Sequence, residues 1–392
     1  MPAQPTWDQG AMEALKAKIE NFLSECVRCG YCQSKCSFLE KYGLPPDIIE
    51  DEPESVFLCT NCGACSKVCP KELKPSEALF ALKYELISNG KLSEKTKRAI
   101  ESSRRYALRG HRFPFVHYPY TEIAFWPGCS LQGTRPDIVK KIPEMLKEVY
   151  GKVGIVLDCC FDPAFQNGDL DIVEKAATKI KERLKAHGIK KLILGCSNCL
   201  KIFKLYMPEI EVDHILNVLP DGQKNFSLSH KEVYLHHPCP SFRFEELQER
   251  VFKIASIHFS IAKQNTIPMC CGLGGLSHNL NEELSEKFTE RHNCAGDPQT
   301  IITYCMGCKN RFLKMGKEAY HLIEILTDAK QMKKPLGSKK KWLNRLILST
   351  SLKLKSKRVV VAILLTLSIL FATLLRSKGY FTIENIFELI RA

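Results

Sequence analysis

The strongest constraint on this chain is a repeated spacing of eight cysteines near its N-terminus. The pattern Cys-x-x-Cys-x-x-Cys-x-x-x-Cys occurs at Cys26, Cys29, Cys32 and Cys36, and again at Cys59, Cys62, Cys65 and Cys69. Three closely spaced thiolates followed by a fourth are typical of chains that bind two 4Fe-4S clusters, and soft thiolate ligands suit the iron of such clusters. A zinc site is the alternative, but one zinc ion uses only four ligands.

This spacing resembles that of the bacterial 8-iron ferredoxins, in which the fourth cysteine of each run binds the other cluster. The resemblance implies one 4Fe-4S cluster on Cys26, Cys29, Cys32 and Cys69, and a second on Cys36, Cys59, Cys62 and Cys65. The small residues Gly30, Gly63 and Ala64 allow backbone amides to point at the cluster sulfides. Ser37 stands where these ferredoxins have a proline, a change that removes no ligand.

The remaining cysteines are arranged in two similar units, residues 121–225 and 226–330. The strands expected there are 123–126, 153–157 and 192–194 in the first unit, and 233–235, 266–267 and 300–304 in the second. Since charged helical stretches separate these runs, each unit is expected to be an α/β unit with a mostly parallel sheet, whose ligands collect at the carboxyl ends of the strands.

Each unit carries five cysteines in the same order. They are Cys129, Cys159, Cys160, Cys196 and Cys199 in the first unit, and Cys239, Cys270, Cys271, Cys305 and Cys308 in the second. Five thiolates exceed the four that a cubane cluster or a zinc ion uses, so a different kind of cluster is favoured. Cys294 fits neither set and is expected to be an ordinary buried thiol.

The two units resemble the CCG domains of heterodisulfide reductase catalytic subunits, and the whole chain resembles a form of that anaerobic enzyme fused to its electron-input subunit. The layout is also similar to the small subunit of anaerobic glycerol-3-phosphate dehydrogenase. The resemblance implies a non-cubane 4Fe-4S cluster in each five-cysteine set, with a disulfide cleaved between the two. On this basis Cys239, Cys270, Cys271, Cys305 and Cys308 are the expected catalytic set.

The two sets differ at one position that bears on access. Phe161 stands where the family has glycine, whereas the loop 272–275 keeps its glycines. We therefore expect the second set to be open to a substrate past these small residues, and the first to relay electrons from the ferredoxin-like part. His236 and His237 precede Cys239 and are candidates for a proton relay. His214 and His321 follow the Cys-x-x-Cys pairs, where a contact to a cluster and a structural role are equally supported.

The basic charge of the chain is concentrated near its C-terminus. The net charge is +14, and residues 330–358 contain many lysines and arginines but no acid. Residues 359–375 then carry no charged side chain and would span roughly 26 Å as a helix, close to the roughly 30 Å of a bilayer core. One transmembrane helix is expected there, with a buried core helix as the alternative. The basic flank predicts contact with anionic lipids and soluble domains on the cytoplasmic side of the inner (cytoplasmic) membrane.

The expected class is thus an α+β multidomain protein with one C-terminal transmembrane helix. Its expected parts are a ferredoxin-like domain (1–110), a linker (111–120), two CCG domains (121–225 and 226–330), a polybasic juxtamembrane linker (331–358), the membrane helix (359–375) and a tail (376–392). The chain has 19 cysteines but no secretory signal at its start, so reduced thiols are expected rather than disulfides.

The expected function is that of a membrane-anchored iron-sulfur oxidoreductase subunit that acts on a disulfide or thiol substrate. The alternative is a pure electron-transfer subunit that links a flavin dehydrogenase to the quinone pool. No flavin, NAD or haem motif is present, because the glycine loop 272–275 lacks the spacing of a dinucleotide-binding turn. A flavoprotein or a cytochrome b or quinone-linked subunit is therefore the expected partner. Nucleic acid is not, because little basic charge remains outside residues 330–358.

Overall fold

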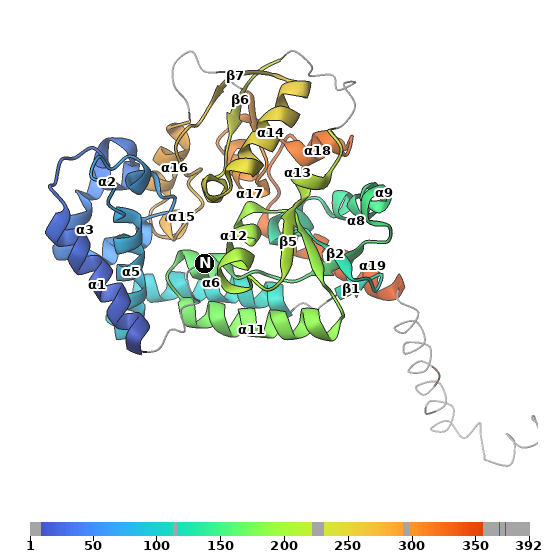
Figure 1. Ribbon diagram of the computed structural model, residues 1–392, viewed down its shortest axis with the longest axis horizontal. Helices are drawn as coiled ribbons and strands as arrows, with labels where there is room; N and C mark the ends of the chain where they lie inside the picture. Colours follow the sequence, from blue (N-terminus) through green and yellow to red (C-terminus); the bar gives the residue numbers. More distant parts are fainter. Residues whose placement is uncertain are drawn as a thin grey trace, which may run out of the picture.

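The computed structural model describes residues 9–112, 116–221, 231–292, 298, 300–355, 368 and 373. Figure 1 shows a helical N-terminal part at one end of the long axis and two α/β units beside it. The helices of the N-terminal part are α1 (Gln9–Glu25), η1 (Gln33–Lys35), α2 (Ser37–Tyr42), α3 (Pro45–Glu50), η2 (Pro53–Leu58), α4 (Ala64–Lys67), α5 (Pro75–Asn89) and α6 (Glu94–Arg112). Helices α1 and α5 pack along each other and enclose a core that includes Phe38 and Phe57.

The first α/β unit contains a five-stranded sheet with the strand order β1-β3-β2-β4-β5. Its elements are β1 (Val116–Tyr118), β2 (Ile123–Trp126), α7 (Cys129–Thr134), α8 (Pro136–Met145), α9 (Lys147–Tyr150), β3 (Gly154–Leu157), α10 (Asp162–Gln166), α11 (Leu170–Ala186), β4 (Lys191–Leu194), α12 (Ser197–Tyr206), β5 (Glu211–His214) and α13 (Ile215–Val218). Strand β1 is antiparallel to β3, and all other neighbours are parallel. The predicted linker 111–120 is therefore wrong in part, because β1 pairs with β3 and forms the edge of this sheet.

The second α/β unit contains a parallel four-stranded sheet with the strand order β7-β6-β8-β9. Its elements are β6 (Glu232–His236), η3 (Cys239–Arg243), α14 (Glu245–His258), β7 (Ser260–Gln264), α15 (Ser277–Leu280), α16 (Glu282–Glu290), β8 (Thr300–Thr303), α17 (Met306–Lys314), β9 (Glu318–His321) and α18 (Leu322–Leu326). The strand predicted at 266–267 is wrong, since the edge strand is β7. No residue of β7 is fully buried, so this strand lacks the apolar run that would mark it in the sequence.

The two units repeat the same strand arrangement, which confirms the two parallel-sheet CCG units expected from the sequence. Strands β3, β2, β4 and β5 correspond in order to β7, β6, β8 and β9. The carboxyl ends of β2, β3 and β4 lead to the cysteines of the first unit, and those of β6 and β8 lead to Cys239 and Cys305. The cysteines thus gather at one end of each sheet, as parallel topology requires.

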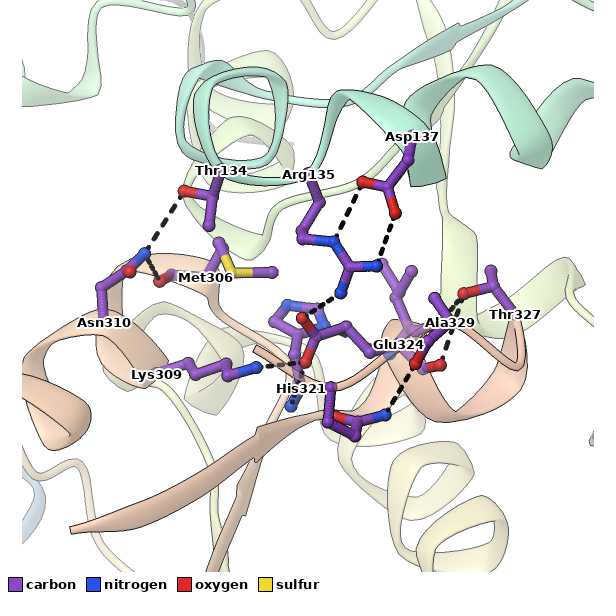
Figure 2. A network of polar contacts seen from close by, with 12 residues as sticks. Thr134, Arg135, Asp137, Met306, Lys309, Asn310, His321, Glu324, Thr327 and Ala329 are labelled. Atoms are coloured by element: carbon purple, nitrogen blue, oxygen red, sulfur yellow. Dashed lines mark hydrogen bonds and ion pairs between the residues drawn. The ribbon is translucent and has the colours of Figure 1, made fainter. Parts of the chain in front are cut away.

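A buried charge network joins the two α/β units. Figure 2 shows Arg135 at the start of α8 and Lys309 on α17 both directed at the carboxylate of Glu324 on α18. Lys309 and Glu324 have no exposed surface, and Arg135 is almost fully buried. Asn310 adds a hydrogen bond of 3.4 Å from its Nδ2 to the Thr134 hydroxyl. Because α7 begins at Cys129 and α17 contains Cys308, this network holds the two cysteine sets in a fixed relation.

The last described helix, α19 (Ser338–Lys355), packs across α7 and β1 of the first unit. It lies at the end of the long axis opposite the helical N-terminal part (Figure 1). Within the part of the chain that the structure describes, no helix is both long and apolar enough to cross a bilayer. The predicted membrane helix 359–375 lies outside the described residues, apart from Ser368 and Thr373.

Candidate functional site

The first cysteine set of the helical part surrounds a small cavity. Its lining includes Cys26, Cys29, Cys32 and Cys69, the four residues that the ferredoxin resemblance assigns to one cluster. Burial raises the pKa of Cys32 to about 11, with a further contribution from the charges of Cys26 and Cys29. An isolated thiol at this place would stay protonated at neutral pH, so the thiolate form needs a bound cation such as cluster iron.

The second cysteine set of the helical part is more deeply buried. Burial raises the pKa of Cys36, and the charges of Cys62 and Cys59 raise it further. Cys65 is within reach of the charges of Cys59, Cys62 and Cys36. Cys36 therefore lies with the second run of cysteines and Cys69 with the first. This is the crossed arrangement that two cubane clusters need.

The two cysteine runs fold into the same local turn. Arg28 and Asn61, just before the second cysteine of each run, have φ angles of 51°. Gly30 and Gly63, just after that cysteine, have φ angles of 77° and 86°. Residues other than glycine seldom adopt such a conformation, and asparagine tolerates it best. Arg28 is held in place by ion pairs with Asp47 and Glu50 on α3.

The five cysteines of the first α/β unit come together at the ends of β2, β3 and β4. The Sγ atoms of Cys160 and Cys199 are 3.3 Å apart. A hydrogen bond from Cys159 lowers the pKa of Cys129 to about 6, and the nearby Arg345 guanidinium and Tyr106 hydroxyl lower it further. Gly128 leaves room for the pair Cys196 and Cys199, since a Cβ there would lie 2.9 Å from the Cβ of Cys196.

The five cysteines of the second unit form an equivalent group. Hydrogen bonds from Cys239 and then from Cys271 hold the pKa of Cys270 well below its usual value. A hydrogen bond from Cys308 lowers the pKa of Cys305. In each set the adjacent cysteine pair is buried, whereas Cys129, Cys196, Cys239 and Cys305 are half-buried.

The donor chemistry of these four groups fits iron-sulfur clusters. None of the 18 cysteines in the described residues forms a disulfide. No three His, Cys, Asp or Glu side chains within the described ranges converge closely enough to hold a single metal ion. A 4Fe-4S cluster requires a wider arrangement, because its thiolate ligands are distributed over four iron atoms. Cys294 lies outside the described residues.

The residue after each adjacent cysteine pair has the same role in both units. The amide of Phe161 donates to Cys159 Sγ at 3.5 Å, and the amide of Gly272 donates to Cys270 Sγ at 3.2 Å. Their φ angles are 63° and 94°, in the region that favours glycine. Phe161 keeps this backbone conformation and buries its ring, so the departure from the family does not disturb the amide contact to sulfur.

The glycine loop of the second unit does not provide the substrate approach that we expected from its small residues. A Cβ at Gly274 would lie 2.6 Å from the Thr60 carbonyl oxygen, and a Cβ at Gly275 would overlap the Cys59 carbonyl oxygen. The amide of Leu276 donates to the Phe57 carbonyl oxygen at 3.0 Å. The glycines therefore let the loop pack directly on the ferredoxin-like part, and this face is closed.

This contact also decides which five-cysteine set lies beside the cysteines of the ferredoxin-like part. Cys62 lies close enough to Cys270 and Cys239 for their charges to act on one another. The second five-cysteine set, rather than the first, is thus the neighbour of the buried cysteines of the ferredoxin-like part.

Ser37 strengthens the junction between the ferredoxin-like part and the second α/β unit, because its hydroxyl accepts a hydrogen bond of 2.8 Å from Arg291 at the end of α16. The serine that replaces the ferredoxin proline is therefore an interdomain contact.

One carboxylate is near both five-cysteine sets. Asp162, at the start of α10, is close enough for its charge to act on Cys129 and Cys160 of the first set and on Cys305 of the second. Lys201 on α12 pairs with it at 2.6 Å, and both side chains are nearly buried. Both sets are thus within electrostatic range of one ion pair that no sequence pattern marks.

A buried lysine connects the ferredoxin-like part to the first unit. Lys83 on α5 has no exposed surface, and its Nζ donates to the carbonyl oxygens of Cys59 at 2.6 Å and Gln166 at 3.0 Å. Desolvation lowers the pKa of Lys83 to about 8. The Lys83 ammonium group is charged below that pH, so a positively charged side chain lies beside Cys59. Its place on the buried face of an ordinary amphipathic helix gives no signal in the sequence.

The two histidines proposed as a proton relay lie in an apolar pocket behind the second set. His236 is fully buried against His292 and Phe312, and within the described residues neither ring nitrogen has a hydrogen-bond partner. Burial, and then the nearby His292, hold its pKa well below the usual value. His237 binds the Tyr304 hydroxyl and Gln264, each at 2.9 Å. Neither histidine contacts a cysteine through these bonds, so a relay role finds no support in this geometry.

His214 and His321 have structural roles, whereas His292 contacts the backbone of the second cysteine set. His214 and His321 end β5 and β9, and their Nδ1 atoms accept hydrogen bonds from the amides of Leu216 and Ile323. Both therefore cap the following helix, which favours the structural interpretation. His292, which no pattern indicates, reaches the Cys270 carbonyl oxygen at 3.1 Å through its Nε2.

The comparisons with known proteins agree with these parts. The family model of the 4Fe-4S dicluster domain matches residues 22–73. The family model of the cysteine-rich domain (CCG) matches residues 123–204 and 233–312. The chain is built from a 4Fe-4S dicluster domain and two CCG domains. These domains bind 4Fe-4S clusters, and the two CCG matches coincide with the two α/β units described above.

Three of the relatives bear the names of oxidoreductases or of their subunits. The chain is 24% identical to a component of the fumarate reductase (CoM/CoB) of Methanothermobacter marburgensis, over 73% of this chain and 67% of that one. It is 21% identical to a component of the dihydromethanophenazine:CoB–CoM heterodisulfide reductase of Methanosarcina mazei, over 78% of this chain and 94% of that one. It is 23% identical to EtfAB:quinone oxidoreductase from Syntrophomonas wolfei, over 65% of this chain and 42% of that one. The chain is thus an iron-sulfur electron-transfer protein related to oxidoreductase subunits.

Proposed function

We propose that the chain is a heterodisulfide reductase-like subunit in which a disulfide or thiol substrate reacts at the two CCG cysteine sets. The observation that carries this proposal is that two equivalent five-cysteine sets occur in one chain, both within electrostatic range of Asp162. Reduction of a disulfide needs two electrons, and two iron-sulfur groups facing one space can supply them one at a time. Two cysteines of each set are only half-buried and are therefore partly exposed to solvent.

Within this proposal, the parts follow one another in a single order. The glycine loop that follows Cys270 and Cys271 packs on the ferredoxin-like part, and Asp162 is within electrostatic range of both CCG sets. We propose that electrons enter or leave at Cys26, Cys29, Cys32 and Cys69, pass the second set, and reach the first set last. Helix α19 packs on α7, which begins at Cys129 of the first set.

The test is the response of the CCG clusters to substrate. Anaerobically purified protein should show a change in the paramagnetic signal of these clusters when a small disulfide is added after reduction. Replacement of Cys305 by alanine should abolish the change, whereas replacement of Cys29 by alanine should remove a cubane signal and leave the response to a chemically supplied reductant. A wild-type protein whose CCG signals ignore every disulfide and thiol would contradict the proposal.

The alternative is a pure electron-transfer subunit that connects a flavin dehydrogenase with the quinone pool. Two observations favour it: the closed glycine loop reduces access to the second set, and a relative bears the name EtfAB:quinone oxidoreductase. This function predicts that reduced protein transfers electrons to a short-chain quinone while its CCG signals remain insensitive to thiols. The same reduced sample therefore separates the two functions.

We further propose that residues 359–375 anchor the chain in the cytoplasmic membrane, with a flavoprotein or a cytochrome b-type subunit as partner. The support is the uncharged run itself and the basic segment before it. A reporter that fluoresces only in the cytosol should be bright when fused before Lys330 and dark when fused after Ala392. Brightness at both ends would contradict a spanning helix.

A further inference from the structure

Helix α19 has two faces of different chemistry. Arg345, Leu348, Ser349 and Leu352 are spaced along one face and are buried against the first unit. Four large aliphatic residues, Leu343, Leu346, Ile347 and Leu354, lie on the opposite face, and each is 47% to 54% exposed. A row of aliphatic side chains on one helix face is uncommon on a protein surface that meets only water, and it marks a site of interaction.

The surroundings of the exposed face favour a lipid surface as its occupant. Lys339 and Lys340 are exposed at the start of the helix, and the whole segment 330–358 contains no acid. A helix with an aliphatic face and basic residues beside it binds the boundary between headgroups and acyl chains of anionic bilayers. The uncharged run 359–375 also begins only a few residues after α19 ends.

The buried face of the same helix reaches the first cysteine set. Arg345 Nε donates to the Cys129 carbonyl oxygen at 3.0 Å, and its guanidinium also binds the Tyr106 hydroxyl at 2.9 Å. Gly133 on α7 permits this close packing, since a Cβ there would lie 3.1 Å from the Cβ of Lys341. Helix α19 is therefore a single layer over the first cysteine set, and its exposed face is turned away from that set.

We propose that α19 lies flat on an anionic lipid surface through Leu343, Leu346, Ile347 and Leu354, and so holds the first CCG set one helix away from the bilayer. This inference rests on the proposed membrane attachment and adds to it the orientation of the protein and the identity of the set nearest the membrane. An electron carrier or substrate dissolved in the bilayer would meet the first set before the second.

The test uses the full chain in its own membranes. A photoreactive phenylalanine analogue replaces Leu343 or Ile347 on the exposed face, and after illumination the protein is analysed by mass spectrometry for lipid and protein adducts. The matched control replaces Phe252, an exposed residue of α14 that lies apart from α19 in Figure 1. A further position, Leu365 in the uncharged run, reports on the membrane anchor itself.

Lipid adducts at Leu343 and Ile347, with none at Phe252, are expected. Protein adducts at Leu343 and Ile347 would show that a partner protein covers the face and would overturn the inference. If Leu343 and Ile347 give no adduct while Leu365 gives lipid adducts, the membrane anchor is supported and the inference about the surface helix is overturned. Lipid adducts at Ile347 but not at Leu365 would keep the surface helix and remove the anchor. No lipid adduct at any position would overturn both. Unchanged iron content in each variant establishes that the protein is folded.

Discussion

At the scale of single residues, several side chains beside the cysteines act through contacts that no motif records. Lys83, Asp162 and Arg345 each bring a charge next to a cysteine set, and Ser37 and Gly275 each form a contact between domains. Their positions in the sequence look ordinary, because a charged residue on a helix is usually solvated. Only the packing of distant segments makes them part of the site.

Replacement of Lys83 by methionine is expected to lower the reduction potential of the cluster bound by Cys36, Cys59, Cys62 and Cys65. A positive charge stabilises the reduced, more negative cluster, and at an effective dielectric constant of about 20 a neighbouring unit charge contributes on the order of 2 kcal/mol. That corresponds to a shift on the order of 100 mV for one electron. Potentiometric titration followed by electron paramagnetic resonance measures it. Lys18→Met, which removes an exposed partner of Glu77, should leave the potential unchanged.

Replacement of Gly275 by alanine is expected to separate the glycine loop from the ferredoxin-like part. Its φ is 59°, and a Cβ would overlap the Cys59 carbonyl oxygen. Gly316→Ala is the matched control, because its φ is 74° and no atom lies within 4 Å of the added Cβ. The control should cost about 1 kcal/mol in the free energy of unfolding from backbone strain alone. Gly275→Ala should cost more and should increase amide hydrogen exchange at Leu276; equal effects of the two variants would argue against the close contact.

At the scale of elements, the sequence predicts what local spacing determines. The cysteine runs, the apolar strands such as β2, β4 and β8, and the duplication of the units follow from periodicity and spacing. Strands β1, β5, β7 and β9 are absent from that prediction because all four are edge strands, whose pairing depends on the neighbouring strand rather than on an apolar run of their own. The open glycine loop was a wrong expectation, because small side chains allow the approach of a backbone as readily as that of a substrate.

Replacement of Glu324 by glutamine is expected to weaken the junction between the two α/β units. Glu324 is the shared partner of Arg135 and Lys309. Without its charge, buried Lys309 has no counter-charge among the described residues and Arg135 keeps only the exposed Asp137, at a cost of about 3–5 kcal/mol in the free energy of unfolding. Urea unfolding followed by circular dichroism measures this cost. Asp137→Asn removes the exposed partner of Arg135 and should cost less than about 1 kcal/mol. Similar costs for both variants would show that the buried pairs do not hold the units together.

At the scale of the whole molecule, the metal content distinguishes the possible cofactors. Four 4Fe-4S clusters require about sixteen iron atoms per chain. Anaerobic purification followed by elemental analysis should give this number, and removal of iron by a chelator should unfold the ferredoxin-like part, because its short helices connect buried cysteines that no disulfide joins. About eight iron atoms with one or two zinc would instead assign zinc to the CCG sets.

The glycine loop packed on Cys59 and Thr60 also changes the kinetics that this protein should show. In separate proteins, transfer between a ferredoxin and its acceptor begins with a diffusive encounter, and its rate depends on concentration and ionic strength. Here the two parts belong to one chain and touch through backbone atoms, so their effective concentration is that of a permanent complex. Internal electron transfer should therefore be first order, equally fast in dilute and concentrated samples, and indifferent to salt.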